Sequence, residues 1–159
     1  MKKFILLIIT ALCLTQTICA QEIFQEVTAI MEKNKTAKFD TKKSLQERKL
    51  ATFKYDAIYY LIMKAAEADS FTERQLGEQV SAMIDYVNLF IGRLSQETKK
   101  SRREVVVALF KKYTLENALF HDMDKEVVYG YVDNENFLTQ FSLDTNWVQA
   151  LEEVQKVYK

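Results

Sequence analysis

Proline is absent from this chain of 159 residues, and glycine occurs only at Gly77, Gly92 and Gly130. Proline and glycine are the residues that most often end regular elements and form tight turns. An all-β domain of many strands would need many such turns, so the sequence argues against one. We therefore expect long helices joined by short connections.

Three Ser-x-x-Glu sequences predict helix starts. In such a capping box the serine oxygen accepts a hydrogen bond from a free backbone N–H, and the glutamate returns one to the serine N–H. The boxes stand 26 and 31 residues apart, a spacing that fits antiparallel neighbours in a bundle. They comprise Ser44 with Glu47, Ser70 with Glu73, and Ser101 with Glu104.

Apolar residues recur every three or four positions after the first two boxes, as on one face of a helix. Gly77 and Gly92 interrupt the second of these helices, where each costs about 1 kcal/mol relative to alanine. We therefore expect a neighbour to pack closely against them. The first stripe comprises Leu50, Phe53, Ala57, Tyr60, Leu61, Ala65 and Ala68, widened by Ile58 and Ile62. The second comprises Leu76, Val80, Met83, Ile84, Val87, Phe90, Ile91 and Leu94.

The remaining segments complete an all-α fold, a single compact bundle of about five or six helices formed by residues 21–159. Asp144 is expected to cap the last helix, in which Trp147 is a core anchor. The other expected segments are a first helix over 22–33, a polar linker near 34–44, a fourth helix over 102–113 and a short helix over 124–132.

Residues 1–20 have the build of a secretory signal peptide. Lys2 and Lys3 precede an apolar run of 11 residues, and the segment ends at Ala20. This run is shorter than the about 20 residues that span a bilayer, so we expect a periplasmic or secreted protein without a permanent membrane span after cleavage. A lipoprotein cleaved before Cys19 is the alternative.

The end of this leader, CAQE, resembles the leaders of exported proteins from Bacteroidota. The resemblance covers only the first 22 residues, and it implies a source rather than a function. Both cysteines, Cys13 and Cys19, lie in the leader, so the cleaved chain has no disulfide and no cysteine ligand.

Charge is unevenly distributed along the sequence. Residues 32–54 hold eight Lys or Arg against three acids, whereas residues 116–153 hold nine acids against Lys125 alone. The two segments either complement each other within the fold or form a docking surface. The acidic second half and the expected export argue against nucleic acid as a partner.

The sequence FHDMDKE, residues 120–126, contains the only histidine and invites a metal or catalytic interpretation. His121, Asp122 and Asp124 could bind zinc or manganese, with Glu126 as a base. Zinc catalysis usually needs three converging ligands, however, and neighbouring residues cannot all converge on one ion. We favour a helix start, so we expect no metal and no cofactor, and we treat these four residues as minor catalytic candidates.

Two other groups are candidates for binding. Tyrosines and phenylalanines in TFKYDAIYYLIMK and in YGYVDNENF, including Tyr129 and Tyr131, suit a groove for a peptide or a sugar, although core packing explains them too. A basic run at a predicted helix start is unfavourable beside the helix dipole, which hints at an acidic envelope partner. It comprises Lys99, Lys100, Arg102 and Arg103.

The sequence thus predicts an exported helical protein whose most favoured role is non-enzymatic binding or envelope assembly, with an envelope protein or peptide as partner. One alternative is a metal-assisted hydrolase that uses His121, Asp122 and Asp124. Another is a self-associating structural protein with a large exposed apolar face.

Overall fold

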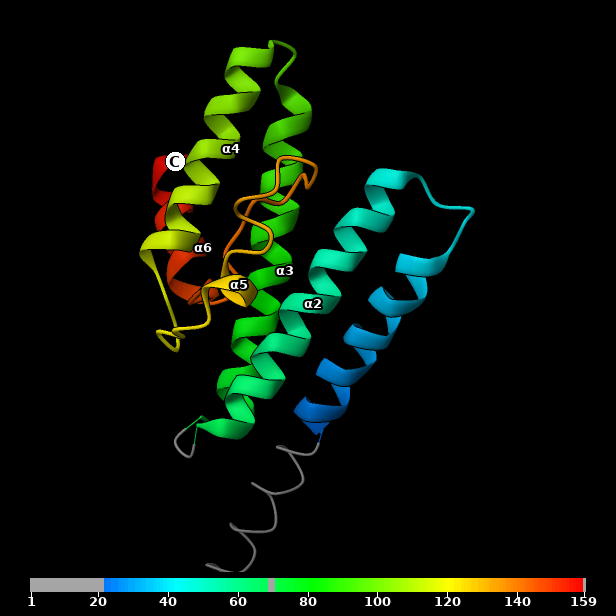
Figure 1. The fold of residues 1–159 in the computed structure, drawn as a ribbon, viewed down its shortest axis with the longest axis vertical. Coiled ribbons are helices and arrows are strands. Elements are labelled where there is room, and N and C mark those ends of the chain that lie inside the picture. The colour runs from blue at the N-terminus through cyan, green and yellow to red at the C-terminus, as the bar shows by residue number, and fades with distance from the viewer. Residues whose placement is uncertain (1–21, 69–70, 159) are drawn as a thin grey trace, which may run out of the picture.

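The computed structural model describes residues 22–68 and 71–158, and over these ranges the chain is all-helical, with no strand. The first described helix covers residues 22–39 and has no label in Figure 1. Five labelled helices follow: α2 (Leu45–Glu67), α3 (Glu73–Gln96), α4 (Lys100–Glu116), α5 (Lys125–Val128) and α6 (Trp147–Val157). The predicted compact helical bundle is therefore confirmed.

Helix α3 is the centre of the bundle. It contacts α2, α4 and α6, and the first described helix runs along the outer side of α2 (Figure 1). The predicted stripe of α3 explains this position, because six of its eight residues are buried, and Ile84 and Ile91 pack partly buried against the core. The buried six are Leu76, Val80, Met83, Val87, Phe90 and Leu94. No helix within the described residues is both long and apolar enough to cross a membrane.

Aromatic side chains fill the core around Trp147, as expected of a core anchor. The Trp147 ring lies edge-on to Tyr86, with ring centroids 5.5 Å apart, and to Phe53 at 6.0 Å. Buried hydroxyls need acceptors, and Tyr86 donates to the carbonyl oxygen of Phe110 at 2.6 Å. This hydrogen bond ties α3 to α4.

The polar linker predicted near residues 34–44 is shorter than expected, because the first helix continues through residue 39. Its polar residues are compatible with a helix: Asn34 donates to the carbonyl of Ile30, and Thr36 donates to that of Glu32. Only residues 40–44 form the connection to α2.

Of the three predicted capping boxes, the one at Ser44 and Glu47 is confirmed, with both hydrogen bonds present. The box predicted at Glu73 is wrong: Glu73 is the first residue of α3, and Thr72 forms the box with Gln75. Its other predicted member, Ser70, lies outside the described residues.

The third predicted box is also wrong, because α4 begins at Lys100, before Ser101, and Lys99 caps it without a side-chain hydrogen bond. Arg103 explains the early start. Its Nη1 donates to the carbonyl oxygens of Leu94 at 2.8 Å and Glu97 at 3.3 Å, which holds the end of α3 beside the start of α4.

Two predictions about the second half also need correction. The short helix α5 ends at Val128 instead of 132, and residues 129–133 continue as hydrogen-bonded turns. Asn146 caps α6, whereas Asp144 is buried and accepts hydrogen bonds from a distant loop instead.

Candidate functional site, a groove between α2 and α5

An open groove of about 430 Å³ lies between α2 and α5. Its α2 wall consists of Asp56, Tyr59, Tyr60, Met63 and Lys64. The opposite wall consists of Asp122, Asp124, Val127, Tyr131 and Leu143. We call these ten residues the α2–α5 groove.

The α2 wall follows from helical geometry. Its residues recur at intervals of three and four, so they share one side of the helix. That side is only partly used by the core: Tyr60 is 5% exposed, whereas Tyr59 is 51% and Met63 is 45% exposed. The groove thus has a packed base and an accessible apolar surface.

Asp144 positions the opposite wall. Its Oδ1 accepts hydrogen bonds from the backbone N–H groups of Leu119 and Phe120 at 3.1 and 2.8 Å, and its Oδ2 accepts from the N–H of Asp122 at 2.8 Å. The chain turns sharply at His121, between Phe120 and Asp122, where the backbone has a φ of 53°. The loop is therefore fixed against the bundle before it enters α5.

A hydrogen-bond cluster links the two walls at one end of the groove. The Oδ2 atom of Asp122 accepts from the Tyr60 hydroxyl at 3.1 Å and lies 3.0 Å from the Lys64 ammonium. The N–H of Asp124 and the ammonium of Lys64 hold the pKa of the Asp122 carboxyl below its usual range. Asp122 therefore stays ionised and keeps the loop attached to α2.

A second cluster lies where Tyr131 meets α2. The Tyr131 hydroxyl donates to Oδ2 of Asp56, whose Oδ1 lies 3.6 Å from the ammonium of Lys38. Burial, reinforced by the nearby Asp56 carboxylate, raises the pKa of the Tyr131 hydroxyl. Burial likewise raises the pKa of the Tyr60 hydroxyl, and the nearby Asp144 side chain raises it further. Both tyrosines are therefore neutral donors at neutral pH.

The four catalytic candidates do not converge. Asp122 and Asp124 line the groove, whereas His121 and Glu126 do not. The Asp124 side chain accepts from the N–H of Val127 at 3.3 Å, as predicted for a helix cap. Within the described ranges, no three His, Cys, Asp or Glu side chains are grouped so that they could hold a metal ion.

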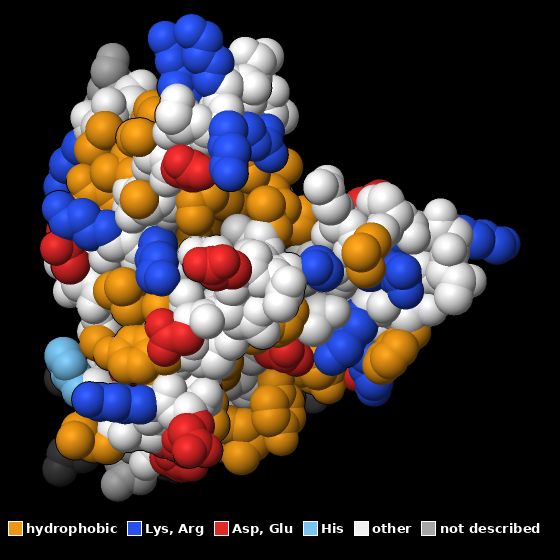
Figure 2. Space-filling view, turned by 45° about the horizontal axis from the view of Figure 1, so that its top comes forward, with side chains coloured by type: hydrophobic (Ala, Val, Ile, Leu, Met, Phe, Trp, Pro, Cys, Tyr) orange, Lys and Arg blue, Asp and Glu red, His pale blue; other side chains and the backbone are white. Residues whose placement is uncertain are grey.

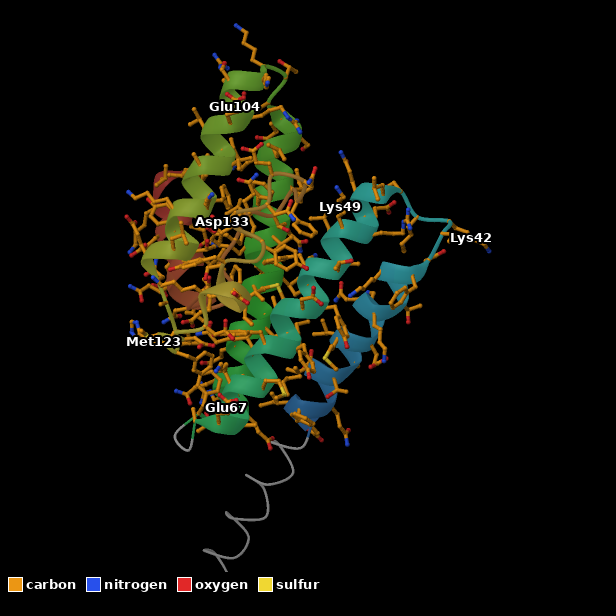
Figure 3. All side chains as sticks on the ribbon, viewed as in Figure 1. Lys42, Lys49, Glu67, Glu104, Met123 and Asp133 are labelled. Atoms are coloured by element: carbon orange, nitrogen blue, oxygen red, sulfur yellow. The ribbon has the colours of Figure 1, made fainter. Side chains whose placement is uncertain are left out.

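The predicted basic candidates lie at the other end of the molecule. Figure 3 labels Glu104 in α4 at one end and Met123, in the loop before α5, towards the other. Lys100 and Arg103 line a separate groove of about 650 Å³ between α4 and residues 135–140. Because Arg103 donates to carbonyl oxygens at the end of α3, its positive charge has a structural role at this helix start.

The two aromatic stretches singled out from the sequence meet in the groove. Tyr59 and Tyr60 come from the first stretch and Tyr131 from the second, whereas Tyr129 is outside the lining. Phe53 belongs to the core. Sequence reasoning missed Asp56, Met63 and Lys64, although their helical spacing from the two tyrosines was a signal that could have revealed them.

Comparisons of this chain with protein-family models, with curated proteins and with solved structures find no match. Its function must therefore be argued from its own residues. Figure 2 shows that apolar patches on the face in view are interspersed with both positive and negative side chains. Such a mixed surface suits contacts that combine apolar burial with charge pairing.

Proposed function

We propose that this protein is an exported, non-enzymatic binding protein that acts at the cell envelope through the α2–α5 groove. The observation that carries the proposal is the groove itself, in which the half-exposed Tyr59, Met63 and Val127 adjoin the side chains of three aspartates. Ligand sites combine apolar walls with a few placed polar groups in this way. The signal-like leader supports export.

The metal-assisted alternative receives less support from the geometry. Its three proposed ligands include His121, which lies outside the groove lining. Asp122 is committed to Lys64 and Tyr60, and Asp124 caps α5. These contacts give each aspartate a structural role, and none of them brings an imidazole to the carboxylates.

Capture of partners from envelope extracts tests the proposal. The bait pair is the native protein and the double variant Tyr59→Ala with Met63→Ala, which removes exposed apolar surface while the buried Tyr60 stays in place. The matched control is Leu45→Ala, which changes a 60% exposed residue of the same helix outside the groove. We expect the double variant to capture at least about tenfold less partner than the native protein, which is the effect of removing an interface hot spot.

Charge reversal of the basic run is a second arm of the same experiment. Lys99, Lys100 and Arg102 are reversed to glutamate, and Arg103 is left intact because it holds the end of α3. We expect capture to be unchanged by this reversal. Loss of capture here, together with full capture by the groove variant, would move the binding surface to the basic end.

A further inference from the structure

The lining of the α2–α5 groove carries more negative than positive charge. Asp56, Asp122 and Asp124 face a single lysine, Lys64. Lys64 pairs with Asp122, and Lys38 pairs with Asp56 from beside the groove. Within the part of the chain that the structure describes, no Lys or Arg pairs with Asp124, so the negative charge at this position is not neutralised by a direct contact.

The wider acidic segment has few ion pairs as well. None of the ion pairs among the described residues joins the basic residues 32–54 to the acidic residues 116–153. The groove thus lies beside an acidic segment that the basic segment does not contact through ion pairs. The negative electrostatic potential of the groove favours a cationic ligand.

One rim of the groove shows how a cation is held there. The Lys38 ammonium lies 5.1 Å from the centroid of the Tyr55 ring and 3.6 Å from Oδ1 of Asp56. An aromatic ring and a carboxylate together form a favourable site for an ammonium group. Tyr59 stacks on Tyr55, with centroids 6.4 Å apart and planes 12° apart, and extends this aromatic surface into the groove lining.

The other end of the groove holds the ammonium of Lys64, which has two partners. It lies 3.0 Å from Asp122 Oδ2 and 3.0 Å from Glu67 Oε2. Both carboxylates raise the pKa of Lys64, Glu67 more strongly. A ligand cation near Asp122 would therefore leave Lys64 still paired with Glu67.

We infer that the α2–α5 groove binds a peptide segment in which a lysine or arginine stands beside an apolar residue. The cation pairs with Asp124, and the apolar side chain packs against Tyr59, Met63 and Val127, of which Val127 is 44% exposed. A groove of about 430 Å³ is within the range of ligand pockets. This inference rests on the proposed function and specifies its ligand class.

The test compares short acetylated peptides of alternating leucine and lysine, leucine and glutamine, or leucine and glutamate. Binding is followed by amide NMR titration of the purified protein, which detects weak complexes and locates them. We expect shifts at Met63 and Val127, and an affinity for the lysine peptide at least about threefold higher than for the glutamine peptide. This preference should shrink in ~0.5 M salt because exposed charge pairs are screened.

Asp124→Asn is the decisive variant. The substitution removes the negative charge, and because asparagine is also a good helix cap, it keeps an oxygen acceptor for the Val127 N–H. Asp133→Asn is the matched control, an exposed aspartate outside the groove lining. We expect the lysine preference to disappear in Asp124→Asn and to persist in Asp133→Asn. Thermal unfolding of both variants verifies that the fold is retained.

Equal affinity for lysine and glutamine peptides, absence of shifts in the groove, or a lysine preference that survives Asp124→Asn would each overturn the inference. Groove shifts with chitobiose and none with the lysine peptide would assign the groove to sugar recognition instead. In these cases, continued loss of envelope capture by the Tyr59→Ala and Met63→Ala variant would leave groove binding intact. Unchanged capture would remove the proposed function as well.

Discussion

At the scale of single residues, Asp144 fixes the acidic wall of the groove. It is 3% exposed and accepts from three backbone N–H groups in residues 119–122. A carboxylate offers enough lone pairs for all three, whereas an amide has one oxygen and two N–H donors. One buried aspartate therefore determines where Asp122 and Asp124 lie relative to α2.

Asp144→Asn should lower the free energy of unfolding by about 2 kcal/mol, because at least one buried N–H loses its acceptor. Urea denaturation measures the loss, and faster amide exchange at Asp122 shows that the loop has loosened. Asp133→Asn should stay within about 0.5 kcal/mol of the native protein, as expected of a surface change. Native stability and native exchange in Asp144→Asn would contradict the assigned role.

The Tyr131 hydroxyl provides a pH-dependent prediction. Its pKa is raised in the folded protein, so its contribution is fully present below the unfolded value of about 10 and is lost as the pH rises towards the folded value. Tyr131→Phe should cost about 1 kcal/mol at pH 7, through the lost hydrogen bond to Asp56. In urea titrations from pH 7 to about 11, that difference should shrink above pH 10. A constant difference would contradict this account.

At the scale of helices, local sequence patterns predicted where the helices lie more accurately than the residues at which they begin and end. Apolar periodicity predicted the buried faces of α2 and α3, because the spacing of apolar residues along a helix determines its buried side whichever neighbour packs against it. The box at Ser44 was also predictable, since all its partners lie within three residues. The start of α4 was not, because Arg103 reaches carbonyls of the preceding helix, a contact that no local motif encodes.

The glycines of α3 give a matched pair of substitutions. A Cβ at Gly77 would lie 2.7 Å from Cγ2 of Ile23 in the first helix, whereas one at Gly92 would meet nothing within 4 Å. The expected close approach is thus confirmed at Gly77 and wrong at Gly92. Gly92→Ala should stabilise the protein by about 0.5–1 kcal/mol, since alanine favours the helix.

Gly77→Ala should fail to gain this stability and should lower it by about 1 kcal/mol, because the first helix must shift or Ile23 must rotate. In a protein that already carries Ile23→Ala, Gly77→Ala should lower the free energy of unfolding by less than it does in the native protein. Chemical denaturation of all four proteins measures this coupling. Equal gains for Gly77→Ala and Gly92→Ala would show that the two helices do not touch tightly there.

At the scale of the whole molecule, the groove exists because irregular segments pack on a helical frame. The sequence already indicated that tyrosines from two distant stretches could line a groove, and the helical spacing of α2 predicts which of its residues share a side. Their meeting with Tyr131 and Asp122 was not predictable. It depends on contacts across more than 60 residues, such as Tyr60 with Asp122 and Tyr131 with Asp56.

Buried polar side chains make this packing specific. Thr145 donates to the carbonyl oxygens of Thr114 and Ser142, and Gln79 accepts from the N–H of Trp147 at 2.7 Å. The bond to Thr114 joins the segment before α6 to α4, and the bond to Gln79 joins the first residue of α6 to α3. Apolar periodicity does not predict these bonds, because their donors and acceptors are polar groups and the bonds to Thr114 and Gln79 join residues 31 and 68 positions apart.

Photo-crosslinking tests most directly the central claim that the α2–α5 groove is the binding surface. A photoreactive phenylalanine analogue replaces either Tyr59 or Leu45, both exposed residues of α2, and each protein is irradiated in envelope extract. We predict a discrete cross-linked product from the position of Tyr59 that is absent or much weaker from that of Leu45. Equal products from both positions, or a product from the Leu45 position alone, would contradict the claim.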